Sequence, residues 1–324
     1  MEVKRFFQIV FLTSILIGCM KDEIPVPASP KGDLNTSQIL MGSDYKYQIY
    51  YDLETDSVIK QNYKTEWDLG FECNNEGWHV VLNTSKLMTA SRTSFDLLSE
   101  VLDTNVIDGW EYDEVSGNLD STAIGDWRGF NKVFIIDRGY NEKGKRQGFY
   151  KIIFDDVKDG SFYFRFAELG STEEKSFVLS TDPSINYMYF SFDNEGSQLA
   201  LEPDKEIWDL VFTQYTYVFF DVDVPYLVTG ALNNPYKCLA KQDSLLKFED
   251  ITREIALGMD LSDEIDIPGY RWKTYDFDNS YYEINTEKNY IIQTATGLYY
   301  KLRFIDFYND SGENGYPKFE FQSL

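Results

Sequence analysis

The sequence predicts an all-β protein, and three observations support this fold class. Tyr and Phe each occur 24 times and aromatic residues make up 17% of the chain, a composition that suits strands. Residues 301–307 (Lys-Leu-Arg-Phe-Ile-Asp-Phe) alternate apolar and polar side chains, and the turn residues 309–315 separate them from a second alternating stretch at 319–321. This pattern predicts a C-terminal hairpin. Helical spacing is limited to 94–102 and 245–257, which we expect to be short helical excursions from an antiparallel β scaffold.

An internal repeat predicts how the strands are organised. When the sequence is shifted by 141 residues, Trp-Asp-Leu-Gly-Phe at 67–71 lies over Trp-Asp-Leu-Val-Phe at 208–212, and each string follows a matching aromatic residue, Tyr51 or Phe192. Similar segments then follow in the same order: 134–136, 148–154 and 160–166 in the first half, and 290–292, 297–304 and 315–321 in the second. We therefore expect two tandem β domains, 43–182 and 183–324. A general likeness among strands is the alternative, but it does not explain the equal spacing.

The first residues predict export and lipidation. Lys4 and Arg5 precede an apolar run at 6–17, which is shorter than the roughly 20 residues of a membrane-spanning helix and is typical of a secretory signal. The following Leu-Ile-Gly-Cys resembles the lipobox of bacterial lipoproteins. We therefore expect residues 1–18 to be a signal peptide and Cys19 to carry the lipid anchor, the alternative being a signal peptide whose cysteine is incidental.

The residues after Cys19 indicate where the anchor points. Met-Lys-Asp-Glu at 20–23 resembles the export signal of Bacteroidetes lipoproteins that reach the outside of the outer membrane. The stretch from 24 to about 42 is rich in proline and polar residues, so 19–42 is expected to be the lipid anchor and a semi-rigid linker. The predicted location is the outer membrane, with the protein exposed at the cell surface; a protein facing the periplasm is the alternative.

Charge and cysteine content limit the partners. The chain has a formal net charge of −24, which argues against nucleic acid because its phosphates would be repelled. Beyond Cys19 the sequence contains only Cys73 and Cys238, which could form a disulfide or remain two buried thiols. Neither cysteine belongs to a spacing typical of a zinc site.

The residues needed for an enzyme are few. His79 is the single histidine, so any Ser-His-Asp or Cys-His arrangement would have to use it, and no nucleophile elbow, phosphate loop or dinucleotide-binding glycine motif is present. With 54 acidic residues, carboxylate pairs are expected by chance. Residues 310–313 lack regular calcium-ligand spacing. We therefore expect a binding protein, not an enzyme, with no metal site other than a possible haem.

Several of these segments resemble a known family. Tyr-Met-Tyr-Phe-Ser-Phe at 187–192, the strings at 208–212 and 269–277, and the ending from 297 to 321 are similar to the HmuY family of Bacteroidetes surface lipoproteins. The resemblance covers the second half directly and the first half through the repeat. It implies an all-β fold, in tandem duplication here. The type member captures haem and delivers it to an outer-membrane receptor, so the resemblance also implies a haem or porphyrin ligand and a TonB-dependent receptor as partner.

The haem expectation raises the question of which side chains would bind iron. The type member uses two histidines, which a chain with His79 alone cannot supply, whereas relatives use methionine, a soft thioether ligand. The resemblance therefore makes His79, Met88 and Met259 the haem-ligand candidates. The alternative is that the histidine is simply packed against Trp78 and that the methionines fill gaps in a core.

A function without haem also fits the composition. The surplus of aromatic residues would suit a surface interaction module that binds a glycan or a protein partner, with Trp78, Trp110 and Trp127 stacking on sugar faces. Such a module could be an accessory subunit of an outer-membrane uptake complex.

Overall fold

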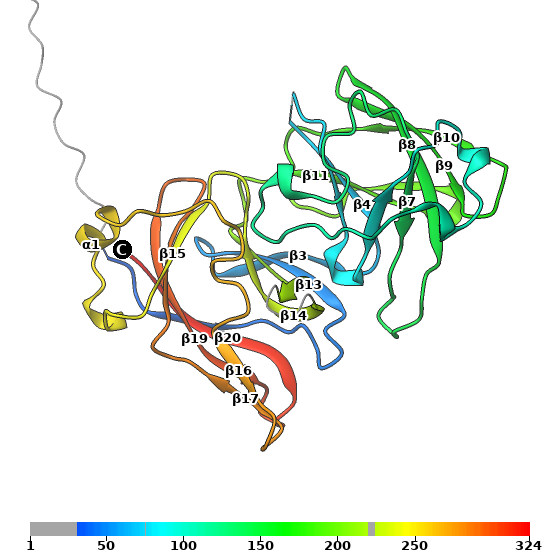
Figure 1. The fold of residues 1–324 in the computed structure, drawn as a ribbon. Coiled ribbons are helices and arrows are strands. Elements are labelled where there is room, and N and C mark those ends of the chain that lie inside the picture. Colours follow the sequence, from blue (N-terminus) through cyan, green and yellow to red (C-terminus); the bar gives the residue numbers. More distant parts are fainter. Residues whose placement is uncertain (1–30, 75, 220–223) are drawn as a thin grey trace, which may run out of the picture. The chain divides into compact units, whose positions relative to one another are not determined.

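The computed structural model describes residues 31–74, 76–219 and 224–324, which Figure 1 colours from blue to red along the sequence. The leader, Cys19 and the first part of the linker lie outside the described residues. All strand pairs are antiparallel, which confirms the predicted all-β class. Among the described residues no helix is long and apolar enough to cross a membrane.

Two sheets enclose what we call the C-terminal core. One has the order β1 (Asn35–Gln38), β20 (Asn314–Ser323), β19 (Tyr299–Tyr308), β18 (Asn289–Gln293) and β15 (Leu239–Asp243); the other has β14 (Val224–Asn233), β13 (Leu210–Phe219), β2 (Tyr47–Asp52) and β3 (Ser57–Tyr63). Apolar side chains that alternate along both sheets fill the space between them, among them Phe212, Phe304 and Phe319. The predicted C-terminal hairpin is β19–β20. Strand β1 lies within the segment expected to be linker.

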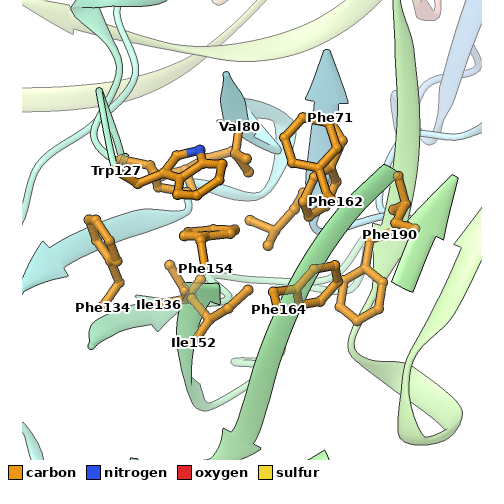
Figure 2. Close-up of a cluster of buried hydrophobic side chains, with 14 of the residues drawn as sticks. Phe71, Val80, Trp127, Phe134, Ile136, Ile152, Phe154, Phe162, Phe164 and Phe190 are labelled. Atoms are coloured by element: carbon orange, nitrogen blue, oxygen red, sulfur yellow. The ribbon is translucent and has the colours of Figure 1, made fainter. Parts of the chain in front are cut away.

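Two further sheets enclose the N-terminal core. The first has the order β10 (Lys175–Ser180), β9 (Ser161–Glu168), β8 (Phe149–Lys158), β7 (Phe134–Asp137) and β6 (Thr89–Arg92); the second has β12 (Ser197–Leu199), β11 (Tyr187–Ser191), β4 (Leu69–Glu72) and β5 (Val80–Leu82). Figure 2 shows how aromatic rings from both sheets fill this core: Phe71 stacks on Phe164 at 5.2 Å between centroids, and Trp127 lies 5.2 Å from Phe154. Rings of this size bury much apolar area, so they dominate the energetics of such a core.

The remaining elements are short. Strands β16 (Lys273–Asp276) and β17 (Tyr281–Ile284) form a separate hairpin. Of the expected helical excursions, 94–102 contains a single 3₁₀ turn, η2 (Leu98–Glu100), and 245–257 contains η6 (Phe248–Asp250) and α1 (Arg253–Leu257). The other 3₁₀ turns are η1 (Thr84–Lys86), η3 (Thr104–Val106), η4 (Leu119–Ser121) and η5 (Asp193–Glu195).

A buried lysine fastens each excursion to its sheet. The Lys151 ammonium donates to the carbonyls of Val101 and Ser171 at 2.6 and 2.7 Å. The Lys301 ammonium donates to the carbonyls of Phe248 and Ile251 at 2.6 and 3.2 Å. Since buried carbonyls need donors, the two lysines explain why each excursion stays closed over its sheet.

Strands from the two predicted repeats pair with each other. Strand β2 pairs with β13, and β11 pairs with β4, so strands from either side of residue 182 share two of the sheets. The backbone N–H of Asp209 donates to the carbonyl of Tyr51, and that of Asp68 to the carbonyl of Phe190, at 2.9 and 2.8 Å. Phe190 is therefore the structural equivalent of Tyr51. The shift by 141 residues had instead aligned Tyr51 with Phe192, two residues further along the chain.

Matched asparagines extend this correspondence. The Asn83 amide donates to the carbonyls of Lys64 and Trp67, and the Asn234 amide donates to those of Lys205 and Trp208, which lie at the repeat spacing. Such matched contacts are what a duplicated unit would leave. The tandem duplication and its boundaries at 43–182 and 183–324 stay predictions.

Candidate functional site

The three predicted haem ligands lie in separate places. His79 stacks on Trp78 at 3.7 Å between ring centroids; its Nδ1 contacts the Glu72 carboxylate and its Nε2 lies 3.5 Å from Asp120. Both ring nitrogens therefore already face carboxylates. Met88 is buried in the N-terminal core, and Met259 packs beside the short helix α1. Each methionine fills a gap in a packed cluster, and their role as iron ligands stays a prediction.

The tryptophans proposed for sugar stacking are not exposed. Trp127 is buried and its indole N–H donates to the carbonyl of Trp78 at 2.6 Å. Trp78 is covered by the Arg128 guanidinium at 3.6 Å, and Trp110 stacks on Phe149 at 5.7 Å. The aromatic side chains that do face solvent are Phe and Tyr.

The two remaining cysteines are free thiols. Both Cys73 and Cys238 are buried and unpaired, which decides between the two alternatives left by the sequence. Burial raises the pKa of the Cys73 thiol to about 11 and also raises that of Cys238. The described residues contain no cluster of three or more potential metal ligands.

One concave site of the described residues is an open groove of about 540 Å³. The loop 111–122 forms one wall, and the end of β13 together with residues 264–271 forms the other. The Arg271 guanidinium donates to the phenol oxygen of Tyr217 at 2.6 Å and lies 5.0 Å from that ring. Apart from Arg271, the charged residues of the lining are all acidic: Glu111, Asp113, Glu114, Glu264 and Asp266. We refer to this site as the groove.

A second site, of about 160 Å³, lies on the other side of the same loop. We call it the inner cavity. Its walls come from both predicted repeats, since Trp67 and Trp208, the matching tryptophans, both line it. Four tyrosines complete the aromatic lining: Tyr50, Tyr187, Tyr189 and Tyr215.

Two buried carboxylates line the inner cavity. The Glu202 carboxylate accepts from the Asn186 amide at 2.6 Å and from the backbone N–H of Tyr187 at 2.9 Å. Asp113 accepts from the backbone N–H groups of Leu82 and Ala123 at 2.7 and 2.9 Å. Burial raises the pKa of each carboxyl to about 7, because the low-dielectric surroundings disfavour the charged form.

Other polar groups of the inner cavity have no partner in the protein. The indole N–H of Trp67, the phenol of Tyr215 and both polar atoms of the Asn233 amide are buried without a hydrogen bond. Such groups are rare in folded proteins because each costs about 1–3 kcal/mol unless water or a ligand satisfies it. Sequence reasoning missed these residues; the repeated tryptophan was the one signal that could have pointed to Trp67.

Comparisons with known proteins found similar solved structures and one matching family. The apo HmuY analog of Tannerella forsythia is 9% identical with a TM-score of 0.29, over 92% of this chain and 99% of that one. Apo PinO from Porphyromonas gingivitis is 11% identical with a TM-score of 0.27, over 90% and 97%. No curated protein matches the sequence significantly. The family described as HmuY protein matches residues 44–321, nearly the whole described chain, and the protein therefore belongs to the HmuY family.

Proposed function

We propose that this protein is a lipoprotein of the outer cell surface that binds haem or a related porphyrin in the groove. Membership of a family of binding proteins supports a binding role over a catalytic one. At about 540 Å³ the groove also has a suitable size, because sites for small molecules and cofactors usually measure about 300–1,000 Å³.

The contact between Tyr217 and Arg271 carries the haem proposal. Tyrosine is one of the side chains that hold haem iron in proteins, and neither histidine nor methionine lines the groove among the described residues. The guanidinium sits 2.6 Å from the phenol oxygen, so it places a positive charge where an iron-bound phenolate would carry its negative charge. Tyr217 is therefore the ligand that the geometry favours over His79.

The acidic wall of the groove determines how a porphyrin would lie. Glu111, Glu114, Glu264 and Asp266 surround the single Arg271, and their carboxylates would repel haem propionates. We expect the porphyrin to enter with its apolar edge inward and its propionates in solvent.

A titration with haemin tests the proposal. The expected result is a Soret shift with a phenolate-to-iron charge-transfer band, and the Tyr217→Phe variant should lose the band and bind at least about tenfold more weakly. Tyr226→Phe is the matched control, because Tyr226 lies opposite Tyr217 in the β13–β14 register, is largely exposed and does not line the groove. Variants of His79, Met88 and Met259 test the earlier candidates.

Two outcomes would overturn this assignment. A wild-type protein that shows no spectral shift with micromolar haemin in either redox state binds no haem. Loss of the band in a His79 or Met259 variant, with Tyr217→Phe unchanged, would place the iron elsewhere. Titration with iron-free protoporphyrin separates iron ligation from simple stacking.

The second candidate function is a surface interaction module, and a patch of exposed aromatic side chains favours it. Phe277 is 85% exposed and Tyr226 is 61% exposed, with Tyr275 and Tyr281 beside the former on the β16–β17 hairpin. Exposed apolar patches commonly mark interaction sites. The partner would be a glycan or a protein, such as a TonB-dependent receptor for which this chain is an accessory subunit.

Cell-based experiments test this candidate and the location together. Cross-linking on intact cells should recover a partner from wild type but not from a Phe277→Ser, Tyr226→Ser double variant, and a glycan array tests sugars directly. A Cys19→Ser variant should be released from the membrane. Protease treatment of intact cells should digest a surface-exposed protein, whereas a protein facing the periplasm would be protected.

A further inference from the structure

We propose that the inner cavity is a second binding site, separate from the groove, for a small organic ammonium ion that also carries an oxygen function. Choline and ethanolamine have this chemistry. The inference does not depend on haem binding, because none of the residues that carry it is Tyr217 or Arg271.

The size of the inner cavity limits the occupant. Its volume is about 160 Å³, close to the engineered apolar cavity of about 150 Å³ in another protein that takes up benzene. A molecule with up to roughly eight non-hydrogen atoms therefore fits, and a porphyrin does not.

The walls favour a cation. Six aromatic side chains line the inner cavity, two tryptophans and four tyrosines. Aromatic faces attract ammonium groups through the negative face of the ring, and tryptophan does so most strongly. No lysine, arginine or histidine is among the described residues that line the inner cavity, so its positive charge would have to come from a ligand.

Buried carboxylates without a counter-ion also favour a cationic ligand. Glu202 and Asp113 accept hydrogen bonds from an amide and from backbone N–H groups, and neither forms an ion pair in the described part of the chain. Glu114 adds a third carboxylate at the rim. A buried charge without a counter-ion is costly, and an ammonium ion in the inner cavity would remove that cost. The absence of a three-ligand cluster in the described residues argues against a metal ion in this role.

The unpartnered donors supply the second half of the recognition. The Trp67 indole N–H, the Tyr215 phenol and the Asn233 amide are buried and unpaired. A hydroxyl or ether oxygen on the ligand could accept from one of them while the ammonium faces Glu202 and the aromatic rings. A neutral polyol or water would also accept hydrogen bonds from these donors, but neither would provide a counter-ion for the buried carboxylates.

The inner cavity reaches the surface at the loop 111–122. Glu114 and Asn118 line it and are exposed. The loop is held by Asp113 and by a hydrogen bond from the backbone N–H of Ile265 to the carbonyl of Ser116 at 3.0 Å. This loop also forms a wall of the groove, and Asp113, Glu114, Val115 and Thr122 line both sites, so the two sites are neighbours on opposite sides of one loop.

Isothermal titration of the full chain with choline and with ethanolamine tests the proposal. The decisive control ligand is 3,3-dimethyl-1-butanol, which has the shape of choline without its charge. We expect choline or ethanolamine to bind and the neutral analogue to bind at least about tenfold more weakly. Glycerol, which fits the volume of the inner cavity, serves as the neutral polyol control.

Variants locate the binding. Glu202→Gln keeps the shape and the acceptor oxygen but removes the charge, and should weaken binding at least about tenfold. Trp67→Phe keeps a ring and removes the unpaired N–H, and should weaken binding of the hydroxyl-bearing amines. Glu206→Gln is the matched control, since Glu206 is exposed and lies outside the lining. Thermal unfolding of each variant confirms that it is folded.

Each result decides the question. Binding of choline or ethanolamine that depends on both charge and Glu202 supports the proposal. Equal binding of 3,3-dimethyl-1-butanol, unchanged binding by Glu202→Gln, binding of glycerol alone, or no heat with any amine up to about 10 mM overturns it. Because these probes contain no porphyrin, the amine titration and the haemin titration are independent. A negative result in either experiment rejects only the proposal that it tests.

Discussion

Asp68 and Asp209 occupy matching positions in the two predicted repeats, and replacing each with asparagine should have opposite effects on stability. Asp68 is fully buried and forms ion pairs with Lys86 and with Arg138, the latter at 2.9 Å. Burial alone would raise its pKa, but the charges of Lys86 and Arg138 outweigh burial and lower it. Asp209 is also buried, yet none of the described salt bridges includes it.

The free-energy cost of ionising the buried Asp209 determines how much stability the Asp209→Asn variant should gain. Burial, with repulsion from Asp52 and Glu54, raises the pKa of Asp209 from 3.8 to about 7. A carboxyl whose pKa is raised in the folded state destabilises that state increasingly as pH rises through this interval. At 1.36 kcal/mol for each pKa unit, the loss reaches at most about 4 kcal/mol above pH 7. Asp209→Asn cannot ionise, so it should be more stable than wild type at pH 8 and close to wild type near pH 4.

Asp68→Asn should behave in the opposite way. It leaves Lys86 and Arg138 buried without their shared counter-ion, and breaking a buried pair in this way costs about 3–5 kcal/mol. Because the folded-state pKa of Asp68 is lowered, its stabilisation is present above the unfolded pKa and is lost as pH falls through the folded value. The deficit of the variant should therefore be equally large at pH 5 and pH 8, and should shrink only below about pH 4, where the carboxyl of the unfolded chain becomes protonated.

Urea unfolding followed by tryptophan fluorescence at about pH 3 and pH 8, on either side of the pKa of an unfolded aspartate, measures both effects. The reasoning would be refuted if Asp209→Asn were destabilised at pH 8 as much as Asp68→Asn. A gain for Asp209→Asn that is the same at both pH values would also refute it, because the proposed origin is ionisation.

Three further predictions concern packing and the buried thiols. Lys151→Met should lose about 1–3 kcal/mol for each carbonyl left without a donor, and hydrogen exchange should rise across 94–102; unchanged exchange there would contradict the fastening role. Gly139→Ala should not fold stably, because φ is +59° and a Cβ would overlap a backbone carbonyl, whereas Gly144→Ala in the same hairpin, with open space, should cost only about 1 kcal/mol; thermal unfolding of the two variants compares them. Cys73 and Cys238 should react with a thiol reagent only after unfolding, and rapid reaction in the native protein would show that one is accessible.

Local patterns predicted much of the fold. Alternation at 301–307 became β19, the turn residues that follow joined it to β20, and the tryptophan strings became equivalent positions on β4 and β13. The family resemblance pointed to the same all-β class. These predictions succeeded because strand alternation and turn preference depend on neighbouring residues alone.

Local sequence patterns could not predict which strands pair with each other. Nothing near residue 69 indicates that β4 pairs with β11 more than a hundred residues later, or that β2 pairs with β13. The helical spacing at 94–102 predicted a short helix, but the segment forms only a 3₁₀ turn. It lies over a sheet, and the Lys151 ammonium binds the carbonyl of Val101 there. Long-range hydrogen bonds and shared burial overrode local propensity there.

For the candidate sites, too, the sequence predicted some features and the tertiary structure alone revealed others. By itself the sequence determined the all-β class, the repeated Trp-Asp-Leu strings and the shortage of histidine. Only the tertiary structure showed that both nitrogens of His79 face carboxylates and that Arg271 meets Tyr217. It alone brought Trp67 and Trp208 around one cavity with unpaired donors and uncompensated carboxylates. The reason is physical: burial and partnership are properties of segments that meet in space, and the chain encodes them through packing between residues far apart in sequence.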